Sequence, residues 1–495
     1  MCRTLEVLTG FRRHEKFGQP LRHTKVWVCG SIQLREAGVT LTSTPLDRRR
    51  FLSLAALGVS MPALATFLSS CSSGNQGALG GGGGATNGKV TELIVATGTT
   101  PWLEPYREVV RHYQEQSGVK ITLRAFPFDG LLTQQVNAVQ QGSKAFDVFQ
   151  INEGWVGDFY SKKWVRPLKE IDSSFKWDEQ LVEYDGVGRW DPKTQLAGLG
   201  GEAYGLPING QIQVFAYRKD LYQKLGLRIP KTFDEAMANG RAAQQAGDAK
   251  YGYLARGQGA AGGGYSVTFD FTPVLHGNGG DFFVQAGKNW APRIDDDVAV
   301  ASLEQYLRLL SLGPAQPQTV DQAQVVAAMQ SGQALQGHLV AGLATQLKDP
   351  AKSRVAGNVG YAVIPAGSVG PAPTSGTWVL GIPAGIADER AKAGLAFMQW
   401  LVEKQTMMQW AAGGGTVTRA DVLKEASGED HPELTATQES LPFIRGGLRY
   451  TFSTDMLNST EVNLNQVVAG QKTPKAGLSA IAQDLRAATA KAGLT

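Results

Sequence analysis

Cysteine, histidine and long apolar runs are scarce in this 495-residue chain, and each scarcity excludes a class of protein. The three cysteines are Cys2, Cys29 and Cys71, so a chain cleaved before Cys71 keeps one thiol and forms neither an internal disulfide nor a thiolate metal cluster. The few histidines after Cys71 do not occur at metal-ligand spacing, and no HExxH motif is present. No later segment has the apolar length of a membrane-spanning helix. We therefore expect no metal and no cofactor.

Charge of one sign is also missing once the first 70 residues are set aside. Of the 48 basic and 44 acidic residues, ten basic and four acidic ones precede Cys71, which leaves 38 basic and 40 acidic residues. The alkaline balance of the whole chain therefore belongs to its beginning. It gives no argument for nucleic acid as a partner.

The stretch 47–71, DRRRFLSLAALGVSMPALATFLSSC, has the layout of an export signal. Three arginines precede an apolar run at 51–68, which barely reaches the length of a spanning helix. The arginines followed by Phe-Leu resemble a twin-arginine signal, and Leu-Ser-Ser-Cys resembles a bacterial lipobox. In such signals the cysteine is acylated and becomes the first residue of the mature chain. We therefore predict an exported lipoprotein, anchored through Cys71 to the outer face of the cytoplasmic membrane; residues 1–45 fit neither signal nor fold.

A flexible tether is predicted after Cys71, because residues 72–87 (SSGNQGALGGGGGATN) are rich in glycine and serine and lack apolar periodicity. An α/β pattern then begins. Residues 92–97 are typical of a buried strand, and Thr100 and Pro101 suit the N-cap and first turn of a helix that ends at Gly118. A second strand alternates over 119–125, a helix covers 131–141, and a third strand covers 146–151. This order predicts a parallel sheet, which binds ligands at the carboxyl ends of its strands.

Further elements are predicted along the rest of the chain. Residues 208–217 form one long extended segment, and Thr232 with Glu235 forms a capping box at the start of a helix. Residues 257–264 form a loose glycine-rich loop, 387–410 is strongly helical, and 478–492 is an amphipathic helix.

The order of motifs resembles the sugar-binding family of bacterial extracellular solute-binding proteins, which serve ABC importers. The motifs that carry the resemblance extend over most of the chain after Cys71: DVFQINEGWVGDFYSKKWVRPL at 147–168, YRKDLYQKLGL at 217–227, PKTFDEA at 230–236, HGNGGDF at 276–282, AAMQSGQAL at 327–335, TSGTW at 374–378 and FMQWLVEKQTMMQWAAGGGTVTR at 397–419. Each motif alone is weak evidence for the family, and the resemblance depends on their order and spacing.

The resemblance implies a two-lobed α/β fold of the periplasmic-binding-protein type, in which each lobe is a mostly parallel sheet flanked by helices. It implies hinge strands near 207–216, 378–383 and 413–418, a ligand held between the lobes, and membrane permease subunits as partners. It implies a monomer without catalytic activity. The domains that follow are a leader at 1–70, a tether at 71–89, an N-terminal lobe at 90–209 with 380–415, and a C-terminal lobe at 210–379 with 416–495.

Sugars present hydroxyl rims and apolar faces, so a sugar site needs flat aromatic rings and planar polar groups. On this ground and on the resemblance, the predicted ligand-binding residues are Thr97, Gly98, Trp102, Asn152, Glu153, Trp155, Asn209, Gln211, Gly280, Asp281, Gly376, Trp378, Gly414 and Arg445. For each tryptophan, a role in core packing is an equally good interpretation. Trp164, Trp400 and Trp410 have spacings that favour the core.

Two departures from the family pattern leave the ligand open. Asn152 and Gln211 stand where many members have aspartate, and an amide donates as well as accepts hydrogen bonds. A phosphorylated or acidic sugar, or a glycerophosphodiester, is therefore an alternative ligand. A secreted glycoside hydrolase is the alternative from another class, because paired carboxylates cannot be excluded by sequence. A sensing module with the same cleft is a third.

Overall fold

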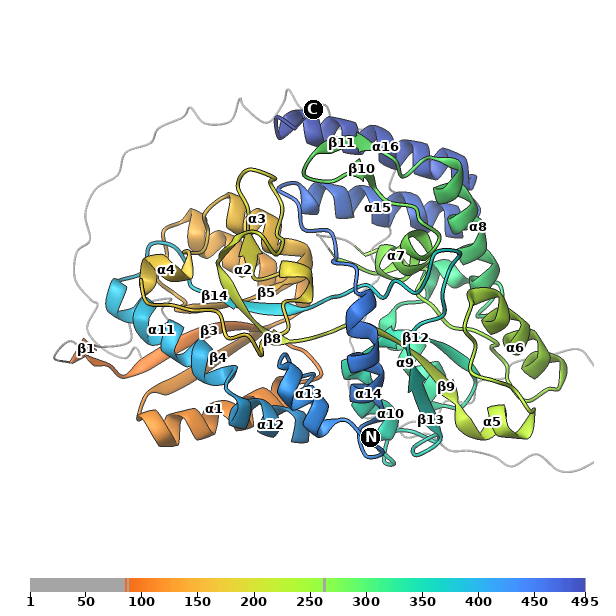
Figure 1. Cartoon of the computed structure of the whole chain (residues 1–495), viewed down its shortest axis with the longest axis horizontal. Coiled ribbons are helices and arrows are strands. Elements are labelled where there is room, and N and C mark those ends of the chain that lie inside the picture. Colours follow the sequence, from red (N-terminus) through yellow and green to blue (C-terminus); the bar gives the residue numbers. More distant parts are fainter. Residues whose placement is uncertain (1–84, 87–88, 261–263, 495) are drawn as a thin grey trace, which may run out of the picture. The chain divides into compact units, whose positions relative to one another are not determined.

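The computed structural model describes residues 85–86, 89–260 and 264–494 (Figure 1). The predicted leader, the lipidation residue Cys71 and most of the predicted tether lie outside the described residues. Two sheets organise the rest of the chain, and we name the parts built on them the first lobe and the second lobe.

The first lobe contains a five-stranded sheet with the order β4-β3-β5-β14-β8. β3 is parallel to β4 and β5, as the alternation of strands and helices predicts, whereas β14 runs antiparallel to both β5 and β8. In Figure 1, α2 and α3 cover one face of this sheet, and α1, α11 and α12 cover the other. The elements are β1 (Ala85–Thr86), β2 (Lys89–Val90), β3 (Glu92–Gly98), α1 (Leu103–Ser117), β4 (Lys120–Phe126), α2 (Phe128–Gln140), β5 (Val148–Asn152), the 3-10 turn η1 (Glu153–Trp155), α3 (Val156–Ser161), α4 (Leu168–Ile171), η2 (Tyr184–Gly186), β6 (Arg189–Trp190), β7 (Glu202–Ala203), β8 (Gly205–Asn209), β14 (Trp378–Gly381), α11 (Asp388–Leu401), α12 (Lys404–Ala412) and α13 (Ala420–Ala426).

The second lobe contains a three-stranded sheet with the order β12-β9-β13, in which both pairs are antiparallel. The prediction of a mostly parallel sheet is therefore wrong for this lobe, because its parallel contacts are isolated bridges such as Leu254 to Gly337. The elements are β9 (Gln213–Arg218), α5 (Lys219–Lys224), α6 (Phe233–Gln245), α7 (Val267–Gly277), β10 (Phe283–Gln285), β11 (Asn289–Pro292), α8 (Asp297–Leu310), η3 (Pro317–Thr319), α9 (Gln322–Gln330), β12 (Gln336–Val340), η4 (Ala341–Leu343), α10 (Ala344–Lys348), β13 (Val359–Ala362), α14 (Pro432–Ser440), η5 (Leu441–Phe443), α15 (Ser453–Val468) and α16 (Pro474–Lys491).

Local signals at helix ends were confirmed in part. The Thr232 side chain accepts a bond from the Glu235 N–H at 3.2 Å, and Gly118 ends α1 in the left-handed conformation with φ 71°. Thr100 is not the N-cap of α1, because residues 100–102 form a turn and the helix begins only after Trp102. The predicted helix over 387–410 is divided at 402–403 into α11 and α12.

The long extended segment predicted at 208–217 is two strands that belong to different sheets. β8 ends at Asn209 and β9 begins at Gln213, so residues 210–212 carry the chain from the first lobe to the second. Residues 373–377 return it to β14, and the Ser375–Ile212 bridge pairs the two crossing segments. The chain passes to the second lobe again between α13 and α14, and the segment 445–450, which joins η5 to α15, contacts the first lobe in a way that the sequence did not reveal. This segment pairs with residue 374 through Arg445 and with the first lobe through a bridge between Leu196 and Tyr450.

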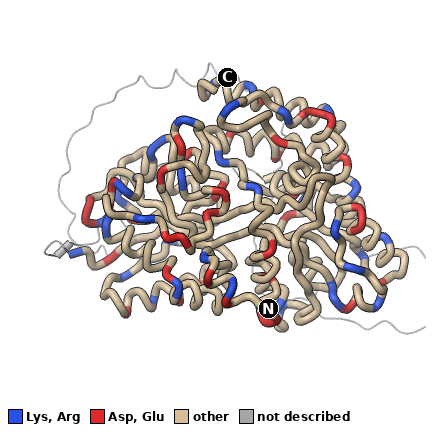
Figure 2. Tube along the Cα trace, in the orientation of Figure 1, with Lys and Arg blue, Asp and Glu red and all other residues tan. Residues whose placement is uncertain are grey.

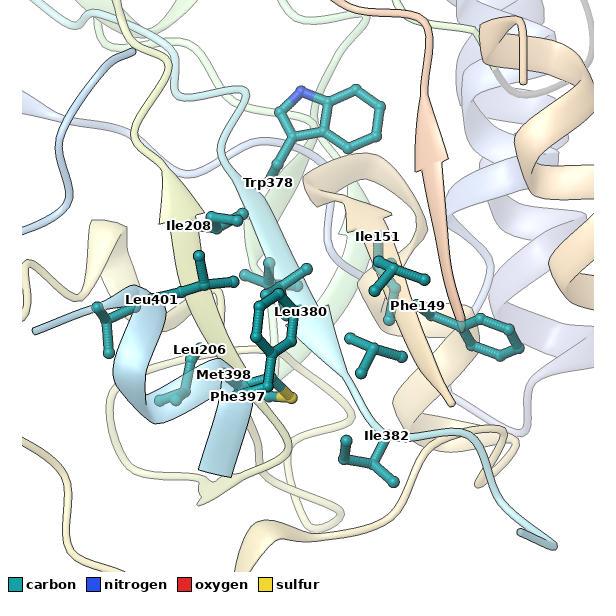
Figure 3. Packing of buried hydrophobic residues seen from close by; sticks show 14 of the residues in the cluster. Phe149, Ile151, Leu206, Ile208, Trp378, Leu380, Ile382, Phe397, Met398 and Leu401 are labelled. Atoms are coloured by element: carbon teal, nitrogen blue, oxygen red, sulfur yellow. The ribbon is translucent and has the colours of Figure 1, made fainter. Parts of the chain in front are cut away.

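Helices cover both faces of the first sheet (Figure 1), and its strands β5, β8 and β14 are buried along their whole length. Figure 3 shows the packing around β14, in which Leu380 faces Phe397, Met398 and other apolar side chains of the same cluster. Trp378 stands at the beginning of β14, above these aliphatic residues. Burial of this apolar surface holds the strands in register, and the strand ends are therefore fixed relative to one another.

Candidate functional site: an aromatic cluster at one edge of the first sheet

Four sequence segments that are far apart in the chain meet at one edge of the first sheet. β3 ends at Gly98, β5 ends at Asn152 and β8 ends at Asn209, while the antiparallel strand β14 begins there with Trp378. The register pairs Trp378 with Asn152 on one side and with Asn209 on the other. Gly98 lies beside the indole, since a Cβ there would be in ordinary contact with Trp378 Cη2, at 3.8 Å. The predicted site residues from these strands therefore share one edge.

The three tryptophans singled out by sequence form one cluster with Phe128. Ring centroids of Trp378 lie 5.9 Å from Trp102, 5.8 Å from Trp155 and 5.8 Å from Phe128, all in edge-to-face geometry. Phe128 also lies 4.7 Å from Trp155. Sequence reasoning missed Phe128; its position directly after β4, at the start of α2, is the signal that could have found it. The cluster supplies large flat apolar surfaces at the sheet edge.

Burial separates the members of the cluster. Trp155 is fully buried, whereas Trp102 and Trp378 keep 8% and 5% of their surface exposed. Trp155 therefore supports the other rings from inside the lobe, and Trp102, Trp378 and the partly buried Phe128 are the rings that reach solvent.

Three polar groups beside the cluster lack hydrogen-bond partners among the described residues. They are the indole N–H of Trp102 and the hydroxyls of Thr100 and Thr377, and all three atoms are buried. An unsatisfied buried donor or acceptor costs about 1–3 kcal/mol. Such groups at a strand edge are suited to bind the hydroxyls of a solute.

Glu153 is engaged within the protein. Its carboxylate, 1% exposed, accepts bonds from the Thr377 N–H at 2.8 Å, from the Gly447 N–H at 2.7 Å and from the Ser375 hydroxyl. The Arg449 Nε lies 3.6 Å from the same carboxylate. Glu153 therefore fastens the crossing segment 373–377 and the segment 445–450 to the end of β5.

Arg449 extends this network to a strained turn of the first lobe. Its guanidinium donates to the Asp185 carboxylate at 2.7 Å and to the Tyr184 carbonyl at 3.1 Å. Tyr184 and Asp185 both have positive φ, 44° and 60°, which L-residues rarely adopt. The arginine is therefore a structural tie between the segment 445–450 and the first lobe.

The predicted amides are also bonded within the chain. The Asn152 Oδ1 accepts from the Gly154 N–H at 3.1 Å, and the Asn209 Oδ1 accepts from Trp410 Nε1 at 3.2 Å. The Asn209 Nδ2 is buried without a partner among the described residues.

Gln211 links the lobes, because its Oε1 accepts from the Gly342 N–H of η4 at 3.1 Å. The Thr97 hydroxyl donates to the side-chain Oε1 of Gln150 at 2.5 Å.

Two predicted glycines allow close approach between the lobes. A Cβ on Gly376 would lie 3.1 Å from the Phe269 ring, and a Cβ on Gly414, which has φ 88°, would lie 2.6 Å from Thr345. Phe269 packs edge-to-face with Tyr265 at 4.9 Å, and burial raises the pKa of the Tyr265 phenol. Sequence reasoning missed this second-lobe aromatic pair, which faces the crossing segment that leads into Trp378.

The remaining predicted residues lie in the second lobe or in the segment 445–450. Asp281 accepts from its neighbouring Phe282 N–H at 2.7 Å and lies 3.8 Å from His276 Nε2, and Gly280 packs against Leu275 in the same turn. The Arg445 backbone pairs with residues 373 and 375.

Two cavities lie away from this edge. One, of about 560 Å³, is bordered by both lobes and lies among residues of α2, α3, α15 and α16, including Leu132, Trp164, Phe452 and Lys491. Across it, the Thr454 hydroxyl bonds Asp158 at 2.7 Å. The other, of about 570 Å³, lies in the first lobe. None of the ligand-binding residues predicted from sequence lines either cavity.

Within the described residues, no group of three His, Cys, Asp or Glu side chains is arranged to hold a metal ion. The helices of the described part were also too short or too polar to cross a membrane.

Comparison with known proteins now bears on this geometry. The family model for the bacterial extracellular solute-binding protein matches residues 96–408, which is more than half of the chain. The chain belongs to this family of bacterial extracellular solute-binding proteins. A relative from Sinorhizobium fredii, named as a probable amino-acid ABC transporter periplasmic-binding protein, is 22% identical over 370 residues, which cover 73% of this chain and 79% of the relative.

Solved structures of solute-binding proteins share the fold. An ABC transporter solute-binding protein of Agrobacterium radiobacter in complex with ribitol has a TM-score of 0.65 at 22% identity, covering 81% of this chain and 99% of that one. The maltose-bound MalE3 of T. maritima has a TM-score of 0.67 at 21% identity, covering 80% and 99%. This solute-binding protein therefore has the two-lobed α/β fold. As a member of its family, it is an extracellular solute-binding protein.

Proposed function

We propose that this solute-binding protein captures an uncharged carbohydrate or polyol at the aromatic edge of the first sheet. The observation that carries the proposal is the combination of exposed margins on Trp102 and Trp378 with unpartnered polar groups at Trp102, Thr100 and Thr377. Indole rings pack against the apolar faces of a sugar, and the polar groups bond its hydroxyls. In this proposal Trp155 acts by supporting Trp378, because it is fully buried.

The charge of the edge supports a neutral ligand. Among the predicted residues from the strands of this edge, Glu153 alone is ionisable, and its oxygens accept bonds from three groups of the chain. An amino acid brings an ammonium and a carboxylate that need opposite charges. A polyhydroxylated solute is satisfied by amides, hydroxyls and an indole N–H. Solved relatives of the same fold are bound to ribitol, maltose, tagatose and mannitol.

The engagement of Glu153 within the chain also argues against hydrolysis of the solute. Glycoside hydrolysis uses two carboxyl groups on either side of the scissile bond, about 5–10 Å apart. Glu153 is already committed to backbone N–H groups and a hydroxyl at this edge. We therefore assign binding and delivery, without turnover, as the role of the chain.

We further propose that the lobes close on the solute, so that closure shifts the population toward a form that the permease recognises. Tyr265 and Phe269 would then bring the second lobe to the solute, because Phe269 faces Gly376 next to Trp378. An acylated Cys71 would keep this monomeric carrier at the outer face of the membrane, and a C71S variant should be released from it.

A thermal-shift screen of the purified protein against polyols, mono-, di- and oligosaccharides, sugar phosphates and amino acids tests the proposal. Ligand binding to the folded state raises the melting temperature. We expect a rise with a neutral polyol or sugar, and its loss in W378A at the same ligand concentration. A rise with amino acids or with sugar phosphates alone would overturn the choice of a neutral solute.

A further inference from the structure

The second cavity, inside the first lobe, has a basic and aromatic lining. Its volume is about 570 Å³, within the range of 300–1,000 Å³ usual for small-molecule sites. It is lined by residues of α4, the following loop, β6 and β7, namely Lys169, Phe175, Lys176, Trp177, Arg189, Gly200, Gly201, Glu202 and Ala203. Figure 2 shows acidic and basic residues mixed along the trace of the molecule, so a cavity with three basic side chains and one acidic one is a local departure.

Arg189 is held in a fixed position in this cavity. Its guanidinium donates to both oxygens of Glu183, at 2.6 and 2.8 Å, and its Cζ lies 4.4 Å from the centroid of the Trp177 ring. A guanidinium carries five N–H donors in a planar fork, and the Glu183 pair uses its Nε and one terminal nitrogen. The other terminal nitrogen makes no hydrogen bond among the described residues, so it can donate to a ligand.

The two lysines of the cavity have no acidic partner within 4 Å in the described part of the chain, whereas Arg189 is paired with Glu183. Lys169 and Lys176 are both exposed at the cavity rim. The one acidic lining residue, Glu202, is also exposed and forms no ion pair there. The rim therefore favours an anion.

The cavity floor adds an unsatisfied donor to flat apolar surface. Phe175 is buried, and the indole N–H of Trp177 is buried without an acceptor among the described residues. The backbone at Gly200 is open, because a Cβ there would meet nothing within 4 Å. A ligand with an anionic end and a flat body would pair with the basic rim and cover the aromatic floor.

This cavity lies at the opposite end of β8 from the aromatic cluster. The Trp177 Cη2 lies 3.0 Å from the Cβ position of Gly188, whose carbonyl bonds the Gly205 N–H at 3.1 Å. Gly205 begins β8 and Asn209 ends it. At about 3.3 Å per residue the two ends are roughly 13 Å apart. The two sites can therefore be occupied independently.

We propose that this cavity is a second binding site, which takes a small organic anion composed of a phosphate or carboxylate group on a flat apolar body. Arg189 and the two lysines bind the anionic group, and Phe175 and Trp177 contact the body. This proposal does not depend on the proposal for the solute site. Either one could be disproved while the other holds.

The test uses the purified protein and phenyl phosphate as the probe, with inorganic phosphate and phenol as its two halves. Binding is followed by the indole N–H signal of Trp177 in 1H–15N spectra, identified by its loss in W177F. We expect a saturable shift with phenyl phosphate, weaker binding of either half, and at least tenfold weaker binding in the double variant K169Q/K176Q. K144Q is the matched control, since Lys144 is an exposed lysine of the same lobe outside the cavity.

No shift with phenyl phosphate, or equal affinity in K169Q/K176Q and K144Q, would overturn the proposal. Equal affinity for inorganic phosphate and phenyl phosphate would overturn the flat apolar body. The W378A variant separates the two sites: it should keep phenyl phosphate binding while losing the neutral solute. If phenyl phosphate binding is lost in W378A with its fold intact, the second site is not independent.

Discussion

The two lobes each contain a cluster of four aromatic rings, and the clusters differ in what surrounds them. Trp102, Phe128, Trp155 and Trp378 stand at the ends of strands in the first lobe. In the second lobe, Phe283, Trp290, Tyr450 and Phe452 join the β10–β11 hairpin to the segment before α15, with centroids 5.1–5.9 Å apart. Similar packing therefore occurs in two places.

The difference is in position. The first cluster meets the chain crossings and has Trp102, Thr100 and Thr377 beside it with unpartnered polar atoms. The second belongs to the apolar core of its lobe, together with residues of α8, α15 and α16, and the Thr451 hydroxyl beside it is also buried without a partner among the described residues. Unpartnered polar atoms therefore do not distinguish the clusters, whereas the carboxyl ends of parallel strands, where such sheets bind ligands, accompany only the first.

The largest expected effect is shared by both clusters. Trp155→Ala and Trp290→Ala should each lower the free energy of unfolding by about 3–5 kcal/mol, because each removes a buried indole and leaves a cavity. Urea unfolding followed by circular dichroism measures this. Phe443→Ala is the control, since that ring is 43% exposed and should change little. A loss below about 1 kcal/mol for Trp155→Ala would show that this ring is not a core residue.

A loss of similar size should come from the buried charged network around Asp270 in the second lobe. Asp270, fully buried, accepts bonds from Arg256 at 2.7 and 2.9 Å and from Gln213 at 3.0 Å. Asp270→Asn leaves the arginine charge uncompensated and should cost about 3–5 kcal/mol in the same urea experiment. Asp349→Asn, on the surface, should leave the unfolding curve unchanged. Equal curves for both variants would contradict the role of the network.

The pH dependence of stability should reveal the same network. Burial opposes ionisation of Asp270, but Arg256 and His338 outweigh it and hold the pKa of this carboxyl below its usual range. A lowered folded-state pKa adds stability above the unfolded value near 4, and this stability is lost as the pH falls through the folded value. The melting temperature should therefore fall below about pH 4, and less steeply in Asp270→Asn. An identical slope in the variant would contradict the assignment.

A smaller effect should distinguish the clusters by ligand affinity. Trp378→Ala should weaken binding of the neutral solute by about 1–3 kcal/mol, because the ring contacts the solute. Trp290→Phe, in the second cluster, should leave the affinity unchanged. Isothermal titration with the ligand found in the thermal-shift screen measures both. Equal losses of affinity in the two variants would contradict the assignment of ligand binding to the first cluster alone.

The smallest expected effect concerns a single hydrogen bond. Trp102→Phe keeps the ring but removes the indole N–H that lacks a partner in the chain. Affinity should fall by about 0.5–1.5 kcal/mol, the usual net value of one hydrogen bond. Unfolding should be little affected in the absence of solute. An unchanged affinity would show that this N–H does not meet the solute.

Much of the first lobe was predictable from local pattern. The strands at 92–97, 119–125 and 146–151 and the helix end at Gly118 were confirmed, because period-two alternation and a left-handed glycine are properties of short segments. The antiparallel second sheet was not predictable. Its central strand β9 pairs with β12 and β13, which both follow it by more than a hundred residues, and the direction of the strands depends on these pairings, which no local pattern encodes.

For the site, the sequence identified the residue types, and the fold decided which of them are exposed and which are bonded within the chain. Trp102, Trp155 and Trp378 were named together from loops and strand ends, but which of them keeps exposed surface depends on the packing of Phe128 and α2. Glu153 was predicted as a ligand contact, and the structure shows its carboxylate bonded to Thr377, Ser375 and Gly447.

By itself, the sequence determined the family, the α/β order of the first lobe and the set of aromatic and amide residues, since these depend on periodicity and motif order along the chain. Only the tertiary structure decided which polar atoms are left unpartnered, which carboxylates are already bonded, and where a basic cavity forms. The bonded carboxylate of Glu153 depends on contacts between segments hundreds of residues apart, and the cavity depends on how the loops and short strands of 169–203 pack on one another. Neither arrangement exists until the chain has folded.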